Sequence, residues 1–343
     1  MSRFNLKVIF SVLSFIFLIS ENATAQKDTI SFLHITDLHV VFSPGSYRPE
    51  IIENRTLKNY DQAEGRFRQF LQVMPQKTGS DLVIATGDLV DFFEAETNSG
   101  ESVVKREQSP EVFDALTYGN HLHQAKLLDI QAGQFADLTA GYNVPCLFTL
   151  GNHDLFSFVW QGNKLSHHQN SSGHARALWT RNLPCFRNGT YYSRLFRVGK
   201  TTYRLLFLDN SFYKFSKDDK TAVPYIDKAQ LYWLDSQLNE ASDDVEIILM
   251  HIPFNDKVAV SGSACELYAA LSKVPSVRLI LAGHRHKNEI TSFPSAENHK
   301  IIQVQTGALV NDEDNWRQIR LTENQIQVSC PGKIAGEMVI PLR

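Results

Sequence analysis

Five short apolar runs in the sequence each lead directly into side chains that bind metal ions. Asp37 and His39 follow residues 30–35, Asp88 follows 82–85, Asn152 follows 146–150, His251 follows 246–250, and His284 and His286 follow 277–281. Residues two apart in an extended segment point the same way, so each of the pairs Asp37/His39 and His284/His286 projects to one side. Their oxygen and imidazole ligands, without a thiolate, favour divalent first-row metals.

The number of ligands, seven, suits two such ions better than one. A site in which two metal ions lie about 3.5–4 Å apart needs a bridging carboxylate and a bridging water, and it favours in-line displacement at phosphorus. One ion holds the phosphoryl oxygens while the pair lowers the pKa of the bridging water to give a hydroxide nucleophile. A lone histidine after a strand is more often an ordinary loop residue, but that explanation fails when suitable residues follow five separate strands. The pattern therefore predicts phosphoester hydrolysis.

The elements that must position these residues are also readable in the sequence. Buried strands are predicted at 30–35, 82–85, 146–150, 203–208, 246–250 and 277–281. These runs are rich in Val, Ile, Leu and Phe and lack period-two alternation, as expected where helices cover both faces of a sheet. Residues 61–74, stopped by Pro75, and 227–238, capped by Asp227, have helical patterns. Because ligands bind outside the carboxyl ends of strands in open α/β sheets, the ligand-bearing strand ends should meet in one crevice.

The rest of the chain fits one domain. Residues 300–306, 316–321 and 326–329 look like antiparallel strands that close it. No linker rich in Pro or Gly divides residues 26–343, so we expect one α/β domain, and the residues alone predict a single doubly wound sheet. Two long polar insertions, near 92–140 and 160–189, flank the ligand-bearing loops, and we expect them to shape the substrate site.

Taken in order, the blocks resemble the calcineurin-like metallophosphoesterase superfamily: Asp37-x-His39, Gly87-Asp88-x-x-Asp91, Gly151-Asn152-His153-Asp154, His251 and Gly283-His284-x-His286. The resemblance implies a four-layer sandwich, in which two mixed sheets are flanked by helices and the metal site lies at the carboxyl ends of the strands. It also implies two divalent ions, manganese, iron or zinc, although the ligand set accepts nickel too. In this assignment Asp37, His39 and His286 hold the first ion, Asp88 bridges, and Asn152, His251 and His284 hold the second.

The same resemblance assigns His153 a catalytic role. Its ring would donate to the phosphoryl group or to the leaving oxygen, while Asp154 orients it. An alkoxide is a poor leaving group, and an adjacent carboxylate fixes the tautomer of an imidazole, so the chemistry agrees. Asp91 is expected to form a hydrogen bond or to cap the following turn. Purple acid phosphatases have a tyrosine at that position, so its absence here argues against a purple iron site.

The composition excludes several classes of protein. With 43% hydrophobic and 21% charged residues in a chain of 343, the protein is neither disordered nor a multi-span membrane protein. Its net charge is −3, and no strongly basic stretch offers a footprint for nucleic acid. The cysteines, Cys146, Cys185, Cys265 and Cys330, are too widely spaced for a zinc site, but they allow up to two disulfides in an oxidising compartment.

Residues 1–25 have the pattern of a secretory signal peptide. Arg3 and Lys7 precede an apolar run of twelve residues, 8–19, and Ala23-Thr24-Ala25 supplies the small residues that a signal peptidase reads. Such a run falls short of the roughly 20 residues that a membrane-spanning helix needs. We therefore expect cleavage near Ala25-Gln26, a periplasmic or secreted protein, and no permanent membrane anchor.

The sequence leaves functions from different classes open. The leading hypothesis is an exported two-metal phosphoesterase that acts on a small molecule or a lipid head group. The short His251-Ile-Pro-Phe block resembles the cyclic nucleotide phosphodiesterase-like branch and slightly favours phosphodiesters over phosphomonoesters. A non-catalytic metal-binding scaffold of the same fold would have lost ligands or the catalytic histidine, and none is lost here. A membrane-tethered phosphoesterase would keep residues 8–19 as its anchor.

Overall fold

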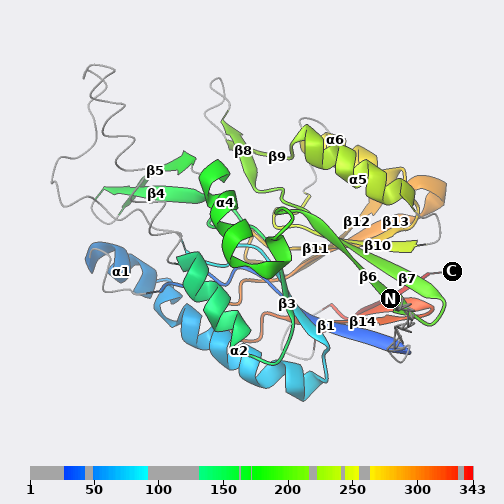
Figure 1. The fold of residues 1–343 in the computed structure, drawn as a ribbon, viewed down its shortest axis with the longest axis horizontal. Coiled ribbons are helices and arrows are strands. Elements are labelled where there is room, and N and C mark those ends of the chain that lie inside the picture. The colour runs from blue at the N-terminus through cyan, green and yellow to red at the C-terminus, as the bar shows by residue number, and fades with distance from the viewer. Residues whose placement is uncertain are drawn as a thin grey trace, which may run out of the picture.

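The computed structural model describes residues 27–42, 49–91, 131–161, 164–170, 172–215, 222–240, 244–254, 263–330 and 336–342. The signal peptide predicted at 1–25 and most of the first predicted insertion lie outside these residues. Two sheets of six strands each form the centre of the molecule (Figure 1).

The first sheet has the strand order β16-β15-β14-β1-β2-β3. Its parallel half consists of β1 (Thr29–Ile35), β2 (Leu82–Thr86) and β3 (Cys146–Thr149). An antiparallel extension consists of β14 (Arg317–Thr322), β15 (Gln325–Ser329) and β16 (Met338–Pro341). The carboxyl ends of β1, β2 and β3 therefore lie at one edge of this sheet.

The second sheet has the strand order β12-β13-β11-β10-β7-β6. The parallel strands are β7 (Thr201–Phe207), β10 (Asp244–Leu249), β11 (Val277–Ala282) and β13 (Lys300–Gln305). The antiparallel edge strands are β6 (Tyr192–Val198) and β12 (Glu289–Pro294). Two hairpins stand outside the sheets: β4 (Phe156–Gln161) with β5 (Lys164–Asn170), and β8 (Phe212–Phe215) with β9 (Ala222–Tyr225).

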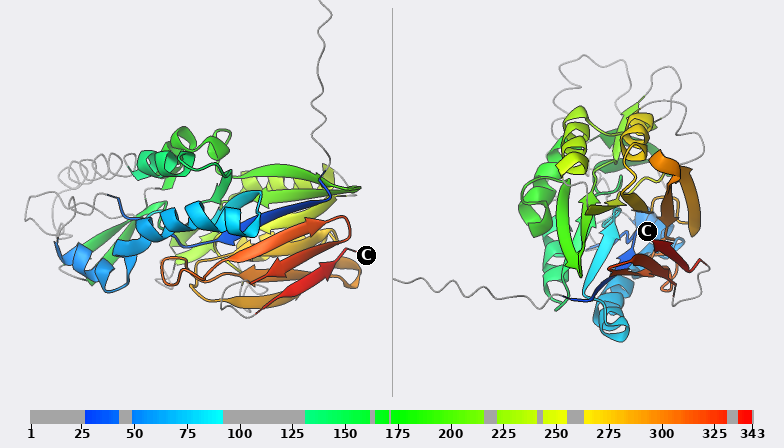
Figure 2. Two further views of the ribbon diagram at one scale, coloured as in Figure 1. Left: turned by 90° about the horizontal axis from the view of Figure 1, so that it is seen from below. Right: turned by 90° about the vertical axis from the view of Figure 1, so that its right-hand side faces the viewer.

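Helices cover the outer faces of the paired sheets, which gives four layers (Figure 2). Helix α2 (Ala63–Thr78) packs on the first sheet, and α5 (Lys228–Glu240) and α6 (Ser263–Ser272) pack on the second. Strand β10 shows why its run has no polar alternation: Ile247 and Leu249 face the core between the sheets, and Ile248 faces the layer of α5 and α6. The remaining helical segments are α1 (Pro49–Thr56), η2 (Tyr60–Gln62), residues 131–140, α4 (Ser172–Asn182), η3 (Pro184–Phe186) and η4 (Ala296–Asn298).

The four-layer fold implied by the resemblance is confirmed, and all six predicted strands are present. The single doubly wound sheet that the residues alone predicted is wrong, because β7, β10 and β11 belong to a second sheet. A strand covered on both faces has the same composition whichever sheet it joins. The strand predicted at 300–306 is present as β13, which pairs antiparallel with β12 on one side and parallel with β11 on the other.

The predicted helices need one correction. Pro75 does not stop α2, which continues to Thr78 and ends where Gly79 adopts a φ of 64°. A proline near the end of a helix removes only one backbone hydrogen bond, whereas the left-handed conformation at Gly79 redirects the chain. The predicted cap of α5 is confirmed, since Asp227 Oδ1 accepts a hydrogen bond from the Gln230 N–H at 2.8 Å.

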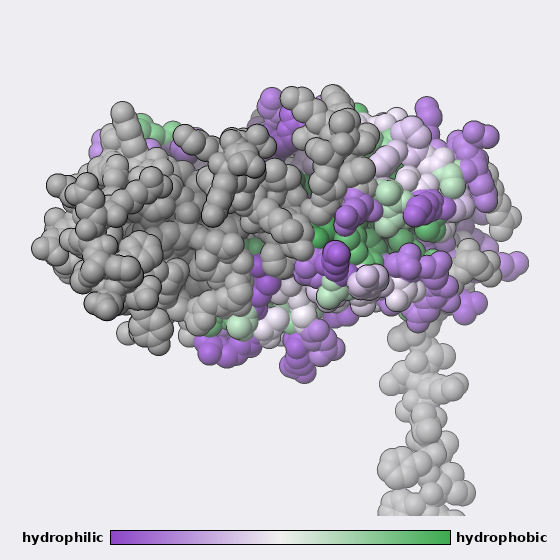
Figure 3. Space-filling model, turned by 90° about the horizontal axis from the view of Figure 1, so that it is seen from above, coloured by the Kyte–Doolittle hydropathy of each residue, from purple (hydrophilic) through white to green (hydrophobic). Residues whose placement is uncertain are grey.

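The surface of the described residues is mixed in character. On the face in Figure 3, hydrophilic residues surround a smaller group of apolar ones. No helix within the described ranges is both long enough and apolar enough to cross a bilayer. Cys146, Cys185 and Cys330 carry free thiols, so no disulfide joins these three.

Candidate metal centre

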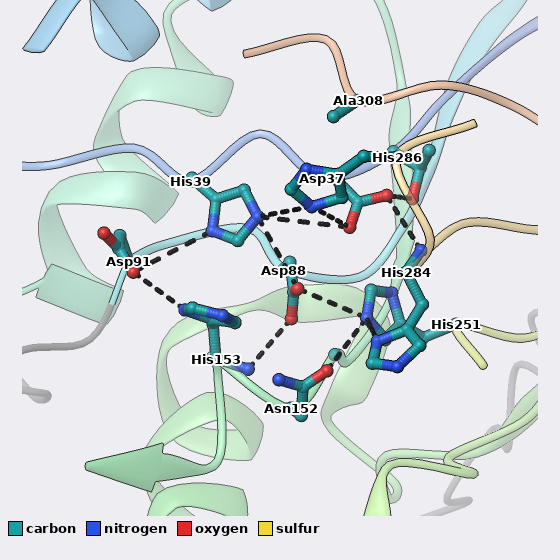
Figure 4. Close-up of polar contacts among 12 residues, drawn as sticks. Asp37, His39, Asp88, Asp91, Asn152, His153, His251, His284, His286 and Ala308 are labelled. Carbon is teal, nitrogen blue, oxygen red and sulfur yellow. Dashed lines mark hydrogen bonds and ion pairs between the residues drawn. The ribbon is translucent and has the colours of Figure 1, made fainter. Parts of the chain in front are cut away.

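The strand ends singled out in the sequence meet in one place, where both sheets contribute loops (Figure 4). The loops after β1, β2 and β3 of the first sheet carry Asp37, His39, Asp88 and Asn152. The loops after β10 and β11 of the second sheet carry His251, His284 and His286. The structure therefore brings together all of the predicted metal ligands.

The first group consists of Asp37, His39, Asp88 and His286, whose ligand atoms all lie within 4.8 Å of one another. The Nε2 atoms of His39 and His286 are 3.2 Å apart. His286 Nε2 lies 3.2 Å from Asp37 Oδ1, and His39 Nε2 lies 3.6 Å from Asp88 Oδ2. Two carboxylate oxygens and two ring nitrogens thus face a common point.

The second group consists of Asp88, His251 and His284, with Asn152 beside them. His251 Nε2 lies 3.3 Å from Asp88 Oδ2, 3.2 Å from His284 Nδ1 and 3.2 Å from Asn152 Oδ1. Because Asp88 Oδ2 is close to ring nitrogens of both groups, Asp88 has the position of a bridging carboxylate.

Neighbouring donors fix the two carboxylates. Asp37 Oδ2 accepts hydrogen bonds from Thr36 Oγ1 at 2.8 Å and from the His284 N–H at 2.9 Å, so Oδ1 is left for the first group. Asp88 Oδ1 accepts the His153 N–H at 2.9 Å, so Oδ2 is left to face both groups. Each carboxylate thus has one structural oxygen and one oxygen directed into the site.

The ring and backbone of His251 are fixed in a similar way. Its Nδ1 donates to the Thr86 carbonyl at 2.7 Å, which leaves Nε2 unprotonated toward the site when the ring is neutral. Asn210, which follows β7, accepts the N–H groups of His251 and Ile252 at 3.1 Å each and donates to the Ile252 carbonyl at 2.7 Å. Asn210 therefore holds the backbone of the His251 loop in place.

The backbone at the site is strained. Positive φ angles of 45–70° occur at Asp37, His39, Asp88, His284 and His286. Such angles are uncommon outside glycine and cluster at functional sites, where the surrounding structure enforces them. Two motif glycines allow the close approach of the loops: a Cβ at Gly151 would collide with the Asp88 carboxylate, and one at Gly283 would collide with Thr36 and Asp37.

Charge accumulates at the centre of the site. Burial would raise the pKa of Asp88, but the charges of His251 and His153 outweigh it and hold this pKa well below its ordinary value. Burial would lower the pKa of His251, but the Asp88 carboxylate raises it to about 9. Burial and the neighbouring His251 lower the pKa of His284 to about 4, so that its ring is neutral at pH 7. The buried carboxylates therefore attract positive charge.

These donors fit a pair of divalent cations. The ring nitrogens of His39 and His286 lie 3.2 Å apart, beside the Asp37 carboxylate. Those of His251 and His284 also lie 3.2 Å apart, beside the Asp88 carboxylate. Two unprotonated ring nitrogens at this separation would repel each other, whereas a shared cation would bind both lone pairs. The buried His and Asp groups therefore fit a dinuclear metal centre.

His153 lies beside the first group, with its ring edge-on to His39 at a centroid distance of 4.5 Å. Its Nδ1 is 2.7 Å from Oδ1 of the fully buried Asp91. An ionised carboxylate can only accept, so Nδ1 carries the proton and Nε2 is left for other contacts.

The expected contact between Asp154 and the His153 ring is not present, and this prediction is corrected. The Asp154 carboxylate is buried and accepts the N–H groups of Leu89, Val90 and Gly151 at 2.9, 3.0 and 2.7 Å. Burial and the Asp88 charge raise its pKa to about 7. Asp154 joins the loops after β2 and β3, and Asp91 reaches the ring because these loops follow adjacent parallel strands.

Two further side chains at the site were not found from the sequence. Arg55 of α1 forms an ion pair with Asp91, and the ring of Tyr60 stacks on that of His39 at a centroid distance of 4.6 Å. Neither follows a strand, so the pattern that revealed the ligands could not reveal them. Arg285, between the two predicted ligands His284 and His286, is exposed, and its Nη1 lies 3.7 Å from Glu289 Oε2.

The fold and the site together define a metal-dependent phosphoesterase. The family model described as calcineurin-like phosphoesterase matches residues 30–288, which is most of the chain. The chain therefore belongs to the calcineurin-like phosphoesterase family.

No curated protein matches the chain. Among solved structures, it is similar to the NAD nucleotidase NadN of Haemophilus influenzae, with 13% identity over 92% of this chain and 54% of that one and a TM-score of 0.41. It is also similar to GAP50, the anchor in the inner membrane complex of Plasmodium, with 15% identity over 92% and 90% and a TM-score of 0.46. The phosphoesterase YfkN of Bacillus subtilis gives 14% identity over 92% and 90% and a TM-score of 0.37. The chain spans about half the length of two of the matched structures, and at these scores none of them informs on its substrate.

Proposed function

We propose that this chain is an exported two-metal phosphoesterase that prefers phosphodiesters to phosphomonoesters. The observation that carries the proposal is the convergence of the other six predicted ligands around Asp88, with the His153 ring at their edge. In this proposal Asp37, His39 and His286 hold one ion, Asn152, His251 and His284 hold the other, and Asp88 is shared.

The two metal ions would act as Lewis acids, and the protein would hold them in place. When bound, divalent ions supply Lewis acidity toward a phosphoryl group and toward water. Oxygen and imidazole donors without sulfur suit manganese, iron or zinc. The protein contributes the fixed carboxylate oxygens of Asp37 and Asp88, which hydrogen bonds at 2.8–2.9 Å hold in place.

His153 is proposed to protonate the leaving oxygen. Its Nδ1–H is held by Asp91 at 2.7 Å, which orients Nε2 away from that carboxylate. A proton held on Nε2 in the imidazolium form would pass to the oxygen as the ester bond breaks, and Asp91 would stabilise the charged ring. In this role Asp91 replaces Asp154 as the orienting carboxylate.

The preference for diesters rests on the His251-Ile-Pro-Phe resemblance and on charge. A diester carries one negative charge at neutral pH, whereas a phosphomonoester carries closer to two. Among the described residues, Arg55 pairs with Asp91 and Arg285 lies beside Glu289, so both of these arginines already contact carboxylates. This arrangement supports the ester with the smaller charge, from a small molecule or a lipid head group.

The test compares bis(4-nitrophenyl) phosphate with 4-nitrophenyl phosphate after addition of manganese or zinc, with His153→Ala as the control. We expect turnover that depends on added metal, a higher kcat/KM for the diester, and a loss of about 10²–10⁴-fold in His153→Ala. A dominant monoester activity would overturn the preference, and no metal-dependent turnover of either ester would overturn the enzyme proposal.

Export is proposed from residues 1–25 and has its own test. Amino-terminal sequencing of the protein recovered outside the cytoplasm should begin at Gln26. A protein that keeps residues 8–19 in a membrane fraction would support the tethered alternative instead.

A further inference from the structure

We infer that Arg55 is a positioning residue: by holding Asp91, it fixes the ring of His153 from a helix that lies outside the strand-end motifs. The inference rests on the proposed function, in which His153 protonates the leaving oxygen. It gives helix α1 and the η2 turn a direct part in the alignment of the site.

The contact between Arg55 and Asp91 is buried on both sides. Arg55 is 4% exposed and Asp91 is fully buried. Arg55 Nε lies 2.7 Å from Asp91 Oδ2, and Arg55 Nη2 donates to Asp91 Oδ1 at 3.3 Å. Two nitrogens of one planar guanidinium therefore contact both oxygens, one as an ion pair and one as a hydrogen bond, which restricts the rotation of the carboxylate as well as its position.

This rotation decides where the second oxygen points. Oδ2 is paired with the Arg55 guanidinium, and Oδ1, which also accepts from Arg55 Nη2, faces His153 Nδ1 at 2.7 Å and lies 3.9 Å from His39 Nδ1. One carboxylate oxygen thus lies between the ring assigned to proton transfer and a ring assigned to metal binding. Without Arg55, the carboxylate could turn about its side-chain bond, and the alignment with His153 would be lost.

Tyr60 holds the same arrangement from a second side. The Arg55 guanidinium lies 5.3 Å from the centroid of the Tyr60 ring, within cation–π range. The Tyr60 ring stacks on His39 with an interplanar angle of 20° and packs against Ala308 and Val310. Arg55, Tyr60 and His39 are therefore packed as one unit, which restricts the guanidinium to the side of Asp91.

A purely structural role for Arg55 is the competing explanation. A buried carboxylate needs a counter-charge, so loss of Arg55 could lower stability without any effect on proton transfer. The two roles differ in one respect. Misalignment of His153 lowers the rate of hydrolysis most for esters with poor leaving groups, because their hydrolysis depends most on protonation of the leaving oxygen. A loss of folded protein instead lowers the rates for all esters by the same factor.

The experiment uses the full chain with Arg55→Lys and Arg55→Gln, and Arg68→Gln as a matched control. Arg68 lies on the exposed side of α2 and pairs with Glu64, away from the site. Kinetics with bis(4-nitrophenyl) phosphate and with diphenyl phosphate give the dependence on the leaving group. We expect Arg55→Gln to lose on the order of tenfold in kcat with the first ester and on the order of a hundredfold with the second. Arg55→Lys, which keeps the charge but not the planar fork, should fall between, and Arg68→Gln should match the wild type.

Two further measurements separate positioning from stability. In the double variant with His153→Ala, Arg55→Gln should cause little additional loss, since the ring it positions is gone. In the metal-free protein, the downfield ring N–H proton resonance of His153 should shift or vanish in Arg55→Gln and should persist in Arg68→Gln. Equal losses with both esters, additive losses in the double variant, or an unchanged resonance would overturn the inference. Should the wild type hydrolyse neither ester, the proposed function fails, while the resonance still decides whether Arg55 positions His153.

Discussion

At the scale of single residues, two nearby carboxylates of the site have separate tasks. Asp91 contacts the His153 ring, and Asp154 accepts three backbone N–H groups. An asparagine in place of either removes a charge but little volume. The two substitutions should therefore have different effects.

The first prediction compares Asp91→Asn with Asp154→Asn. Asp91→Asn should lower kcat about 10²-fold or more while the bound metal is retained, because only the orientation and charge of His153 change. Asp154→Asn should mainly lower the free energy of unfolding, by about 1–3 kcal/mol, because a buried acceptor of three hydrogen bonds is impaired. Steady-state kinetics and thermal unfolding measure the two effects. A kinetic defect in Asp154→Asn with normal stability would restore it as the orienting residue.

The second prediction concerns the close approach at Gly283. A Cβ there would collide with Thr36 and Asp37, so Gly283→Ala should cost about 1–3 kcal/mol of stability and weaken metal binding. At Gly65, in α2, an added methyl group would meet no atom within 4 Å, and Gly65→Ala should stabilise the protein by up to about 1 kcal/mol. Unfolding curves with and without metal measure both changes. Equal effects of the two substitutions would contradict the packing described for the loop after β11.

At the level of secondary structure, the strands that carry the ligands could be predicted, whereas β6 and β12, the edge strands of the second sheet, could not. Both faces of β1, β2, β10 and β11 are covered, so their apolar runs stand out. Strand β12 has no fully buried residue, and the middle of β6 is largely exposed. Their sequences are therefore polar enough to resemble loops. The division into two sheets depends on long-range pairing, which local composition does not record.

The third prediction uses Glu246, a buried carboxyl group of β10. Burial raises its pKa to about 7 from an ordinary value of 4.5. Between these two pH values, the folded protein keeps a proton on Glu246 that the unfolded chain has lost. This contribution to stability is complete below pH 4.5 and is lost as the pH rises through 7. Glu246→Gln should therefore raise stability at pH 8 by about 2 kcal/mol and have little effect at pH 4. Urea unfolding at the two pH values measures this. A loss of stability at pH 8 would contradict the assignment.

At the scale of the whole molecule, the metal centre joins the two sheets. Asp37 and Asp88 come from the first sheet, and His251, His284 and His286 come from the second. Each proposed ion therefore takes ligands from both sheets. His34 makes a second polar link, because its ring contacts Thr86 Oγ1 and Thr306 Oγ1 at 2.9 Å each.

The fourth prediction is that removal of metal destabilises the entire domain. A ligand that binds only the folded state at about 1,000 times its Kd adds about 4 kcal/mol to stability. EDTA should therefore lower the Tm by several degrees, and manganese or zinc should restore it. The variant Asp88→Asn, with its bridging carboxylate gone, should show a much smaller response. The same Tm with and without EDTA would contradict a centre that links the sheets.

The sequence identified the ligand-bearing loops because each motif is local and follows a strand. It did not identify the supports of those loops. Arg55 reaches Asp91 from a helix that precedes β2, and Asn210 supports His251 from the end of a different strand. Such contacts depend on how distant segments pack. For the same reason the sequence assigned the orientation of His153 to Asp154, its neighbour in the chain.

The side chains around Asp88 should form one dinuclear centre with Asp88 as its bridge. The most direct test is the number of manganese or zinc ions bound per chain, measured by titration of the metal-free protein. We expect two equivalents in the wild type, and in Asp88→Asn a loss of at least tenfold in affinity with fewer than two equivalents retained. A wild-type protein that binds one ion or none, or an Asp88→Asn variant that still binds two with unchanged affinity, would contradict a dinuclear centre bridged by Asp88.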